Sequence, residues 1–224
     1  MLDNPVWASL VHGPHAHLGR RSGAAVRFLP EVGPFHGLAD PGDPAAWADL
    51  AALADPGAQF LVTAPRIAPP DDWTVVERLE GVQMVATALD TEPDPDAILL
   101  GPDDVPEMLD LTARTRPGPF GPRTIELGTY LGVRHDGRLI AMAGERMRPP
   151  GFTEISAICT DPDFRGKGLA SRLVRAVAAG VVARGETPFL HVAATNTAAI
   201  RLYVAMGFTV RSRPEFAVLR APAG

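Results

Sequence analysis

The stretch that decides the fold is EISAICTDPDFRGKGLASRLVRAV, residues 154–177. Its first seven residues carry β-branched side chains at three positions and alternate in polarity, which predicts a strand at 154–160. From Leu169 onward apolar residues recur at helical spacing, which predicts a helix that stops at Gly185. The order is therefore a strand, a turn that contains two glycines, and a helix.

The turn at residues 164–170 is suited to binding a pyrophosphate group. The first amides of a helix have no partner within the helix and together carry about half a unit of positive charge. Gly166 and Gly168 allow a tight turn and leave these amides accessible to a phosphate. Arg165 and Lys167 add positive charge, and Lys167 is the only lysine in the chain.

Two other phosphate-binding motifs fit this turn poorly. A P-loop requires a serine or threonine directly after its lysine, whereas Lys167 is followed by Gly168. A dinucleotide-binding turn requires a third glycine, where this chain has Ser171, and an acidic residue at the end of the next strand. Glu186 precedes the strand that we expect next, at 189–193. A P-loop is therefore excluded, and NAD binding is the weaker alternative.

Two motifs resemble those of the GNAT acetyltransferase superfamily. RGKGLA at 165–170 matches R-x-x-G-x-A, the acyl-CoA pyrophosphate loop of that superfamily. NTAAIRLYVAMGF at 196–208 resembles its next signature, N-x-x-A-x-x-L-Y-x-x-x-G-F, and the two are separated by one expected helix and one expected strand. The resemblance covers about residues 97–224, whereas residues 1–95 match no family that we can name.

The resemblance implies an α/β fold with a GNAT-like mixed central sheet flanked by helices. We place an acyl-CoA-dependent N-acetyltransferase domain at 96–224 and a smaller N-terminal α/β domain of unknown role at 1–95. The acidic, proline-broken segment 90–96 is the expected linker. The N-terminal domain either shapes the acceptor pocket, mediates homodimer formation or is a decayed copy of the same fold. Strands are expected at 24–29, 60–62, 73–79, 82–88, 97–100, 130–135, 138–147, 152–160, 189–193 and as a pair near 208–219. Helices are expected at 4–18, 44–53, 105–115, from 169 to the stop at Gly185, and within the second motif.

Composition and charge exclude several classes of protein. No apolar run reaches the roughly 18 residues needed to span a bilayer, and the first residues show no secretory signal. The net charge of −5 divides into −8 for residues 1–95 and +3 for residues 96–224. The positive part suits an anionic cofactor but is too weakly basic for nucleic acid. A single cysteine, Cys159, suits a reducing compartment, so we expect a cytoplasmic protein without a membrane or nucleic-acid partner.

The resemblance implies that an acetyl group passes from acetyl-CoA, a co-substrate, to an amine by direct attack in a ternary complex. Two strands of the family fold splay apart, and the pantetheine arm lies between them. Asn196 is expected to cap its helix and to touch the cofactor. The rival from another class is an acyl-CoA-binding regulatory module without turnover. The residues expected to bind the cofactor are Ala157, Ile158, Cys159, Arg165, Gly166, Lys167, Gly168, Leu169, Ala170 and Asn196.

The reaction needs a base and an acid. An alkylammonium with a pKa near 10.4 must lose a proton, which costs about 4.6 kcal/mol at pH 7. We expect Glu154 to be the base, with Glu145 as the second candidate; the alternative for Glu154 is a carboxylate that is solvated or paired with an arginine. Tyr203, inside the second motif, is expected to protonate or hydrogen-bond the leaving thiolate. The alternative for Tyr203 is a tyrosine packed in the core.

The acceptor itself is not readable, and a small-molecule or a peptide amine fits equally. Arg114, Arg116 and Arg123 lie in the loop that borders the acceptor site in this family. They either recognise a carboxylate on the acceptor or are solvated.

Other reactive side chains carry weaker signals. Cys159 is expected to be a small core residue rather than a nucleophile, because no activating neighbour is evident. His191 is expected to be structural. The histidines at 12–17 predict a solvated loop rather than a metal site, because no carboxylate or cysteine accompanies them.

Overall fold

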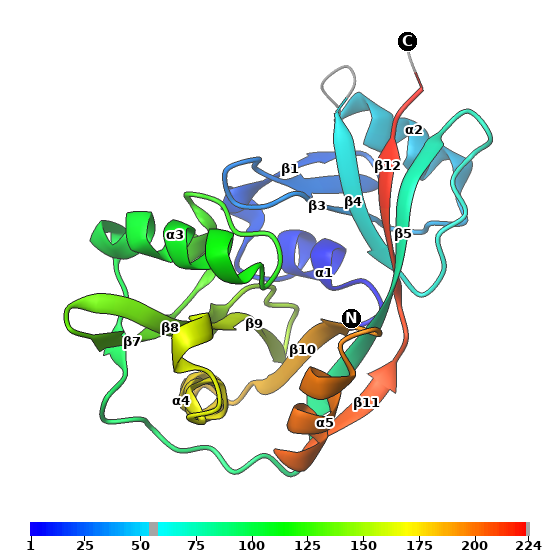
Figure 1. Ribbon diagram of the computed structural model, residues 1–224. Coiled ribbons are helices and arrows are strands. Elements are labelled where there is room, and N and C mark those ends of the chain that lie inside the picture. Colours follow the sequence, from blue (N-terminus) through cyan, green and yellow to red (C-terminus); the bar gives the residue numbers. More distant parts are fainter. Residues whose placement is uncertain (54–57, 223–224) are drawn as a thin grey trace.

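The computed structural model describes residues 1–53 and 58–222 (Figure 1). Within these residues twelve strands form one sheet in the order β1-β2-β3-β4-β12-β5-β10-β9-β8-β7-β6, and β11 pairs separately with β5. This mixed sheet with flanking helices is the predicted fold class. The strands are β1 (Gly19–Ser22), β2 (Ala25–Phe28), β3 (Phe35–Leu38), β4 (Gln59–Ala64), β5 (Thr74–Ala86), β6 (Ile98–Leu99), β7 (Tyr130–His135), β8 (Arg138–Glu145), β9 (Phe152–Thr160), β10 (Thr187–Ala193), β11 (Phe208–Ser212) and β12 (Glu215–Arg220). The α-helices are α1 (Pro5–Val11), α2 (Pro44–Ala52), α3 (Val105–Thr115), α4 (Leu169–Ala183) and α5 (Thr197–Ala205).

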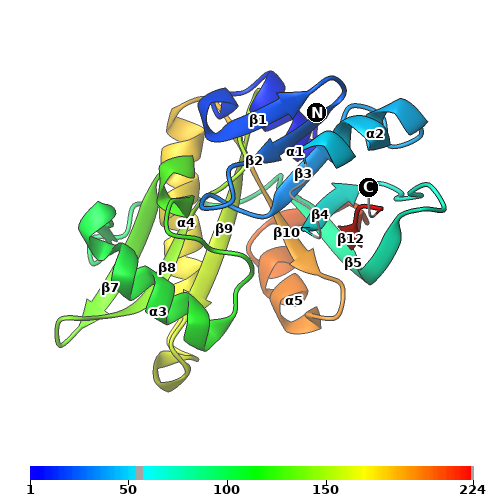
Figure 2. The same cartoon turned by 90° about the horizontal axis from the view of Figure 1, so that it is seen from above.

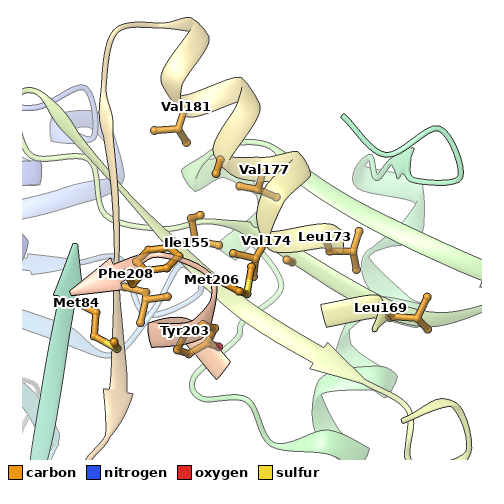
Figure 3. Packing of buried hydrophobic residues seen from close by; sticks show 14 of the residues in the cluster. Met84, Ile155, Leu169, Leu173, Val174, Val177, Val181, Tyr203, Met206 and Phe208 are labelled. Carbon is orange, nitrogen blue, oxygen red and sulfur yellow. The ribbon is translucent and has the colours of Figure 1, made fainter. Parts of the chain in front are cut away.

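Helices cover both faces of the C-terminal part of the sheet. α3 packs on β8 and β9 from one face, and α4 packs on β7 to β10 from the other (Figures 1 and 2). The apolar face predicted for α4 is confirmed, because Leu173 and Val174 are fully buried. Figure 3 shows Val174 beside Met206, and both belong to the same core cluster as Leu173, Met84 and Phe208.

Strand β5 links the two parts of the molecule. The sequence predicts two strands, at 73–79 and 82–88, but the structure has one strand of 13 residues, Thr74–Ala86. Gly81 lies in its middle, where a Cβ would come within 2.3 Å of the Phe216 ring. This glycine therefore marks a close approach inside a strand rather than a break between strands.

Strand pairing crosses the boundary expected at residue 95. The second half of β5 pairs with β10 and β11, which belong to the C-terminal part. In return β12 lies between β4 and the first half of β5. The expectation of a strand pair near 208–219 is wrong, because β11 and β12 follow one another along the same side of β5 instead of pairing with each other. The sheet is therefore shared, and residues 1–95 and 96–224 each supply strands to the other part.

Segment 90–96, the expected linker, is attached to α4. Arg172 Nη2 lies 2.6 Å from Asp94 Oδ1 and 2.6 Å from Asp96 Oδ2. Arg175 Nη1 also donates to the carbonyl oxygen of Asp90, so α4 holds this segment at three positions as it passes the helix (Figure 1).

The histidine segment 12–17 is partly buried, which corrects the expectation of a solvated loop. His15 is 3% exposed, and its Nε2 lies 2.9 Å from the carbonyl oxygen of Leu127. Burial lowers the pKa of His15 to about 4, so this side chain is neutral near pH 7.

No helix in the described part of the chain combines the length and apolar content needed to cross a membrane.

Candidate active site

The candidate site is a cleft where β9 and β10 separate. These parallel strands are paired only between Phe152–Glu154 and Thr187–Phe189. Beyond that point β10 stays paired with β5 as far as Ala193, while β9 stays with β8. The resulting cleft has a volume of about 860 Å³ and is bordered by α5, the turn before α4 and the loop after α3. We call it the β9–β10 cleft.

The turn at residues 164–170, which we call the glycine turn, ends at the cleft, and no side chain caps the amides at the start of α4. Gly166 and Gly168 both have φ of +76°, a backbone conformation that glycine adopts without a steric cost. α4 begins at Leu169, and the N-cap position, Gly168, supplies no side-chain acceptor. The first amides of this 15-residue helix therefore face the cleft without an intrahelical partner. Lys167 does not line the cleft; its Nζ lies 4.7 Å from the centre of the Phe164 ring.

A bulge in β9 interrupts its pairing at the middle of the cleft. The β8–β9 register shifts between Met142 and Gly144, which leaves Ala157 and Ile158 outside the regular ladder. Ala157 has φ of +52°, a left-handed conformation that costs a non-glycine residue roughly 1–2 kcal/mol. Such strain persists only where the surrounding structure imposes it, and it is common at binding sites. Ala157, Ile158 and Cys159 all line the cleft.

Glu154 is paired with an arginine, which was the alternative to its role as the base. Its side chain is fully buried, and Arg146 donates two hydrogen bonds to it, Nε to Oε2 at 2.8 Å and Nη2 to Oε1 at 2.6 Å. Burial alone raises the pKa of this carboxyl, but the charge and hydrogen bonds of Arg146 outweigh burial, and with His191 they lower the pKa to about 2. The carboxylate is therefore ionised but has no exposed surface toward the cleft.

His191 connects this ion pair to the neighbouring strand. Its Nδ1 lies 2.7 Å from Glu154 Oε1, and its Nε2 lies 2.9 Å from Gln83 Nε2. The Gln83 amide is oriented by two other contacts, because its Nε2 donates to the Leu2 carbonyl and its Oε1 accepts from Arg211. A Gln83 nitrogen can only donate, so His191 Nε2 carries the lone pair and Nδ1–H donates to Glu154.

Tyr203 lies on α5 at the wall of the cleft. Its ring packs against Phe208, with 5.9 Å between the ring centres, and the residue is 8% exposed. Burial raises the pKa of the phenol to about 12, so it is protonated at neutral pH. Within the described residues its hydroxyl has no hydrogen-bond partner. Asn196 caps α5, because its side chain accepts from the Ala199 amide at 3.1 Å, and it also lines the cleft.

The remaining candidates for proton transfer or covalent chemistry are held in structural roles. Glu145 is buried, and Arg184 Nη2 lies 3.0 Å from its Oε1, outside the lining of the cleft. Cys159 lines the cleft, but burial raises the pKa of its thiol to about 11, so it is not a thiolate.

The three loop arginines differ in their contacts. Arg114 pairs with Asp110 and Asp161, and Arg123 pairs with Glu126. Arg116 lines the cleft and, among the residues that the structure describes, has no side-chain hydrogen bond or ion pair.

The structure thus brings nearly all of the predicted site residues to one cleft. The exceptions are Glu154, which lies behind the wall, and Lys167. Sequence reasoning missed Arg146 and Gln83. Arg146 lies opposite Glu154 across the β8–β9 hairpin, so the register of this hairpin could have identified Arg146. No local signal identifies Gln83, because it reaches His191 only through the pairing of β5 with β10.

Comparison with known proteins adds independent evidence. The FR47-like protein family matches residues 130–217. N-alpha-acetyltransferase RimI of Mycobacterium tuberculosis is 38% identical over 82 residues, which is 35% of this chain and 51% of that protein. The chain therefore spans about half the length of this curated relative.

Two solved structures extend the similarity to the whole chain. A GNAT-family protein from Novosphingobium aromaticivorans is 42% identical with a TM-score of 0.90, over 100% of this chain and 99% of that one. A GCN5-related N-acetyltransferase from Kribbella flavida, at 20% identity, has a TM-score of 0.62 over 98% of this chain and 96% of its own and indicates a shared fold. The first match includes residues 1–95, which the sequence motifs left unassigned.

Proposed function

Because this chain belongs to the GNAT family of acetyltransferases, we propose that it transfers an acetyl group from acetyl-CoA to a primary amine by direct attack in a ternary complex. The observation that carries this proposal is the β9–β10 cleft, which leads from the bulge at Ala157 to the open amides at the start of α4. An acyl-CoA presents a thioester and an amide-bearing arm, followed by a pyrophosphate, in the matching order.

The cofactor is held mainly by backbone amides in this proposal. The pyrophosphate binds the amides between Gly166 and Ala170, where the helix N-terminus favours negative charge. The pantetheine arm lies along β9, and the bulged segment at Ala157 and Ile158 supplies donors that the β8–β9 ladder does not use. A donor directed at the thioester oxygen stabilises the charge that develops there during attack.

Tyr203 acts on the leaving group. A phenol whose pKa is raised to about 12 donates a hydrogen bond at neutral pH rather than accepting a proton. The thiolate of CoA, with a thiol pKa near 8.5, departs more readily when such a donor reaches it. The hydroxyl of Tyr203, which has no hydrogen-bond partner among the described residues, supports this role from the cleft wall.

The amine proton leaves through His191 rather than directly to Glu154. A base that takes the proton itself must touch the amine, and Glu154 has no exposed surface. His191 lines the cleft and carries the lone pair on Nε2. Taking a proton there ends the hydrogen bond from Gln83, whose amide must move away from the new N–H. The adjacent carboxylate of Glu154 balances the new positive charge.

This base assignment is tested with His191→Gln, which can still donate to Glu154 but cannot take up a proton. We expect kcat/KM to fall about 10²-fold, the usual contribution of general base catalysis. The loss should shrink for acceptors whose ammonium has a lower pKa, because these amines need less help to deprotonate. Glu145→Gln is the control, since Glu145 is a buried carboxylate outside the cleft. An equal loss for all amines would argue for a structural role.

The function itself is tested by ligand binding followed by turnover. We expect acetyl-CoA and CoA, but not NAD, to raise the melting temperature, and an amine panel to release free thiol from acetyl-CoA. Stabilisation by NAD alone, or by none of the three at millimolar concentration, would contradict the proposal. Stabilisation without thiol release for any amine would instead indicate an acyl-CoA-binding module.

A further inference from the structure

The wall of the β9–β10 cleft is cationic. Arg116 and Arg165 carry its positive charge, because the charge of Arg146 is balanced by Glu154. None of the described residues that line it is an aspartate or a glutamate. Glu154, the carboxylate behind this wall, is already neutralised by Arg146. An acceptor with several positive charges would therefore find no carboxylate to replace its lost hydration.

Arg116 is the cationic side chain of this wall that is open for an acceptor. Arg146 is committed to Glu154, and Arg165 Nε donates to the Thr160 carbonyl oxygen at 3.3 Å, beside the glycine turn. Arg116 comes from the loop after α3, which packs on the face of the sheet opposite α4 and its phosphate-binding turn. In Figure 2 α3 and α4 lie on opposite sides of β8 and β9. An acceptor and a cofactor that enter from opposite faces would meet in the cleft.

The backbone at Arg116 is held in place by the end of α3. Arg116 is the C-cap of α3 and has φ of +50°, a left-handed conformation that is uncommon for a residue with a side chain. The ion pair between Arg114 and Asp161 attaches the end of α3 to the end of β9. A guanidinium on a fixed backbone loses less entropy when it binds a carboxylate through two hydrogen bonds.

We propose that Arg116 binds a carboxylate of the acceptor, and that the substrate is an amine with an anionic group close to the reacting nitrogen. The inference rests on the proposed acetyl transfer and narrows its acceptor class. Two sources share this chemistry, the α-carboxylate of a free amino acid and the acidic side chain of the first residue of a peptide. Polyamines and other polycationic amines are excluded by the same charge distribution.

The test measures binding of N-acetylated products by calorimetry, with the whole chain and with or without saturating CoA. The amino-acid arm compares N-acetylglycine and N-acetylleucine with their primary amides. The peptide arm compares acetyl-Asp-Ala-amide with acetyl-Asn-Ala-amide, and spermidine is the cationic probe. The variants are Arg116→Ala, Arg116→Lys and the control Arg123→Ala, whose arginine lies in the same loop but pairs with Glu126.

In at least one arm the carboxylate ligand should bind about 10- to 100-fold more tightly than its amide, the range of a charge-assisted hydrogen bond. Arg116→Ala should abolish this preference, Arg116→Lys should restore part of it, and Arg123→Ala should leave it unchanged. Equal binding of acid and amide in both arms, or tighter binding of spermidine, would overturn the inference. Loss of CoA affinity in Arg116→Ala, with no change in acid preference, would also overturn it by assigning Arg116 to the cofactor.

These outcomes are separate from those that test acetyl transfer. CoA binding by the wild-type chain is measured in the same titrations, so its failure counts against the proposed function alone. The preference for acid over amide is read with and without CoA and does not depend on turnover.

Discussion

Replacing Glu154 with glutamine should destabilise the protein strongly, because it leaves Arg146 buried without its counter-ion. Glu154 is fully buried and Arg146 is 8% exposed. Breaking such a pair by removing one partner costs about 3–5 kcal/mol. The lowered pKa of Glu154 indicates a similar loss of stability. A decrease from the ordinary value of 4.5 to about 2 corresponds to roughly 3 kcal/mol of unfolding free energy, at about 1.36 kcal/mol per pKa unit.

The sign of the pH dependence follows from the same pKa. The folded-state pKa of Glu154 lies below the unfolded value, so its contribution to stability is complete above about pH 4.5 and is lost as the pH falls toward 2. Urea unfolding followed by circular dichroism, at several pH values, should show this acid-dependent loss in the wild-type chain. Glu154→Gln should lack that component, because glutamine does not titrate in this range.

Two further variants separate the ion pair from general packing. The double variant Arg146→Met/Glu154→Gln should recover much of the lost stability, because no isolated charge remains buried. Glu145→Gln should cost less than Glu154→Gln, because the partner of Glu145, Arg184, is 34% exposed. A loss below about 1 kcal/mol in Glu154→Gln, or a double variant no more stable than the single one, would refute the reasoning.

Three other substitutions have defined outcomes. Tyr203→Phe should lower kcat about 10²-fold while the Kd for acetyl-CoA, measured by calorimetry, stays the same; normal turnover would place Tyr203 in the core only. Gly168→Ala should weaken acetyl-CoA binding about 10-fold, because alanine resists φ of +76°. The control Gly151→Ala, at a glycine outside the turn with φ of +80°, should change stability alone. Equal effects of the two variants on binding would count against a role of the glycine turn in binding the cofactor. Gly81→Ala should cost about 1–3 kcal/mol in urea unfolding through its clash with Phe216, whereas Gly101→Ala, which meets open space, should be nearly neutral.

Local signals explain where the sequence analysis succeeded. The predicted strand at 152–160 and the predicted helix at 105–115 match β9 and α3. The hairpin between β7 and β8 turns at Asp136 and Gly137, which both have positive φ as an Asp-Gly turn requires. Asp43 caps α2 as predicted, because its side chain accepts from the Ala45 amide at 2.9 Å. Each of these features is set by neighbours within a few residues.

The features that were missed depend on residues far apart in the chain. In the sequence Gly81 indicates a break between strands, and only its contact with Phe216, 135 positions later, explains the glycine. The pairing of Glu154 with Arg146 requires the β8–β9 register, and the tautomer of His191 requires Gln83 from another strand. Periodicity and motif spacing carry no information about such contacts. The cleft residues were predictable because two contiguous motifs contain most of them.

The position of β12 between β4 and β5 has a consequence for protein synthesis. Residues 215–220 leave the ribosome after residues 1–214, yet they fill a central place in the N-terminal part of the sheet. Until they arrive, the facing edges of β4 and β5 have no strand to bind and remain open to other chains. The molecule therefore cannot fold one half at a time during translation, and expression of residues 1–95 or 96–224 alone should yield an aggregating fragment.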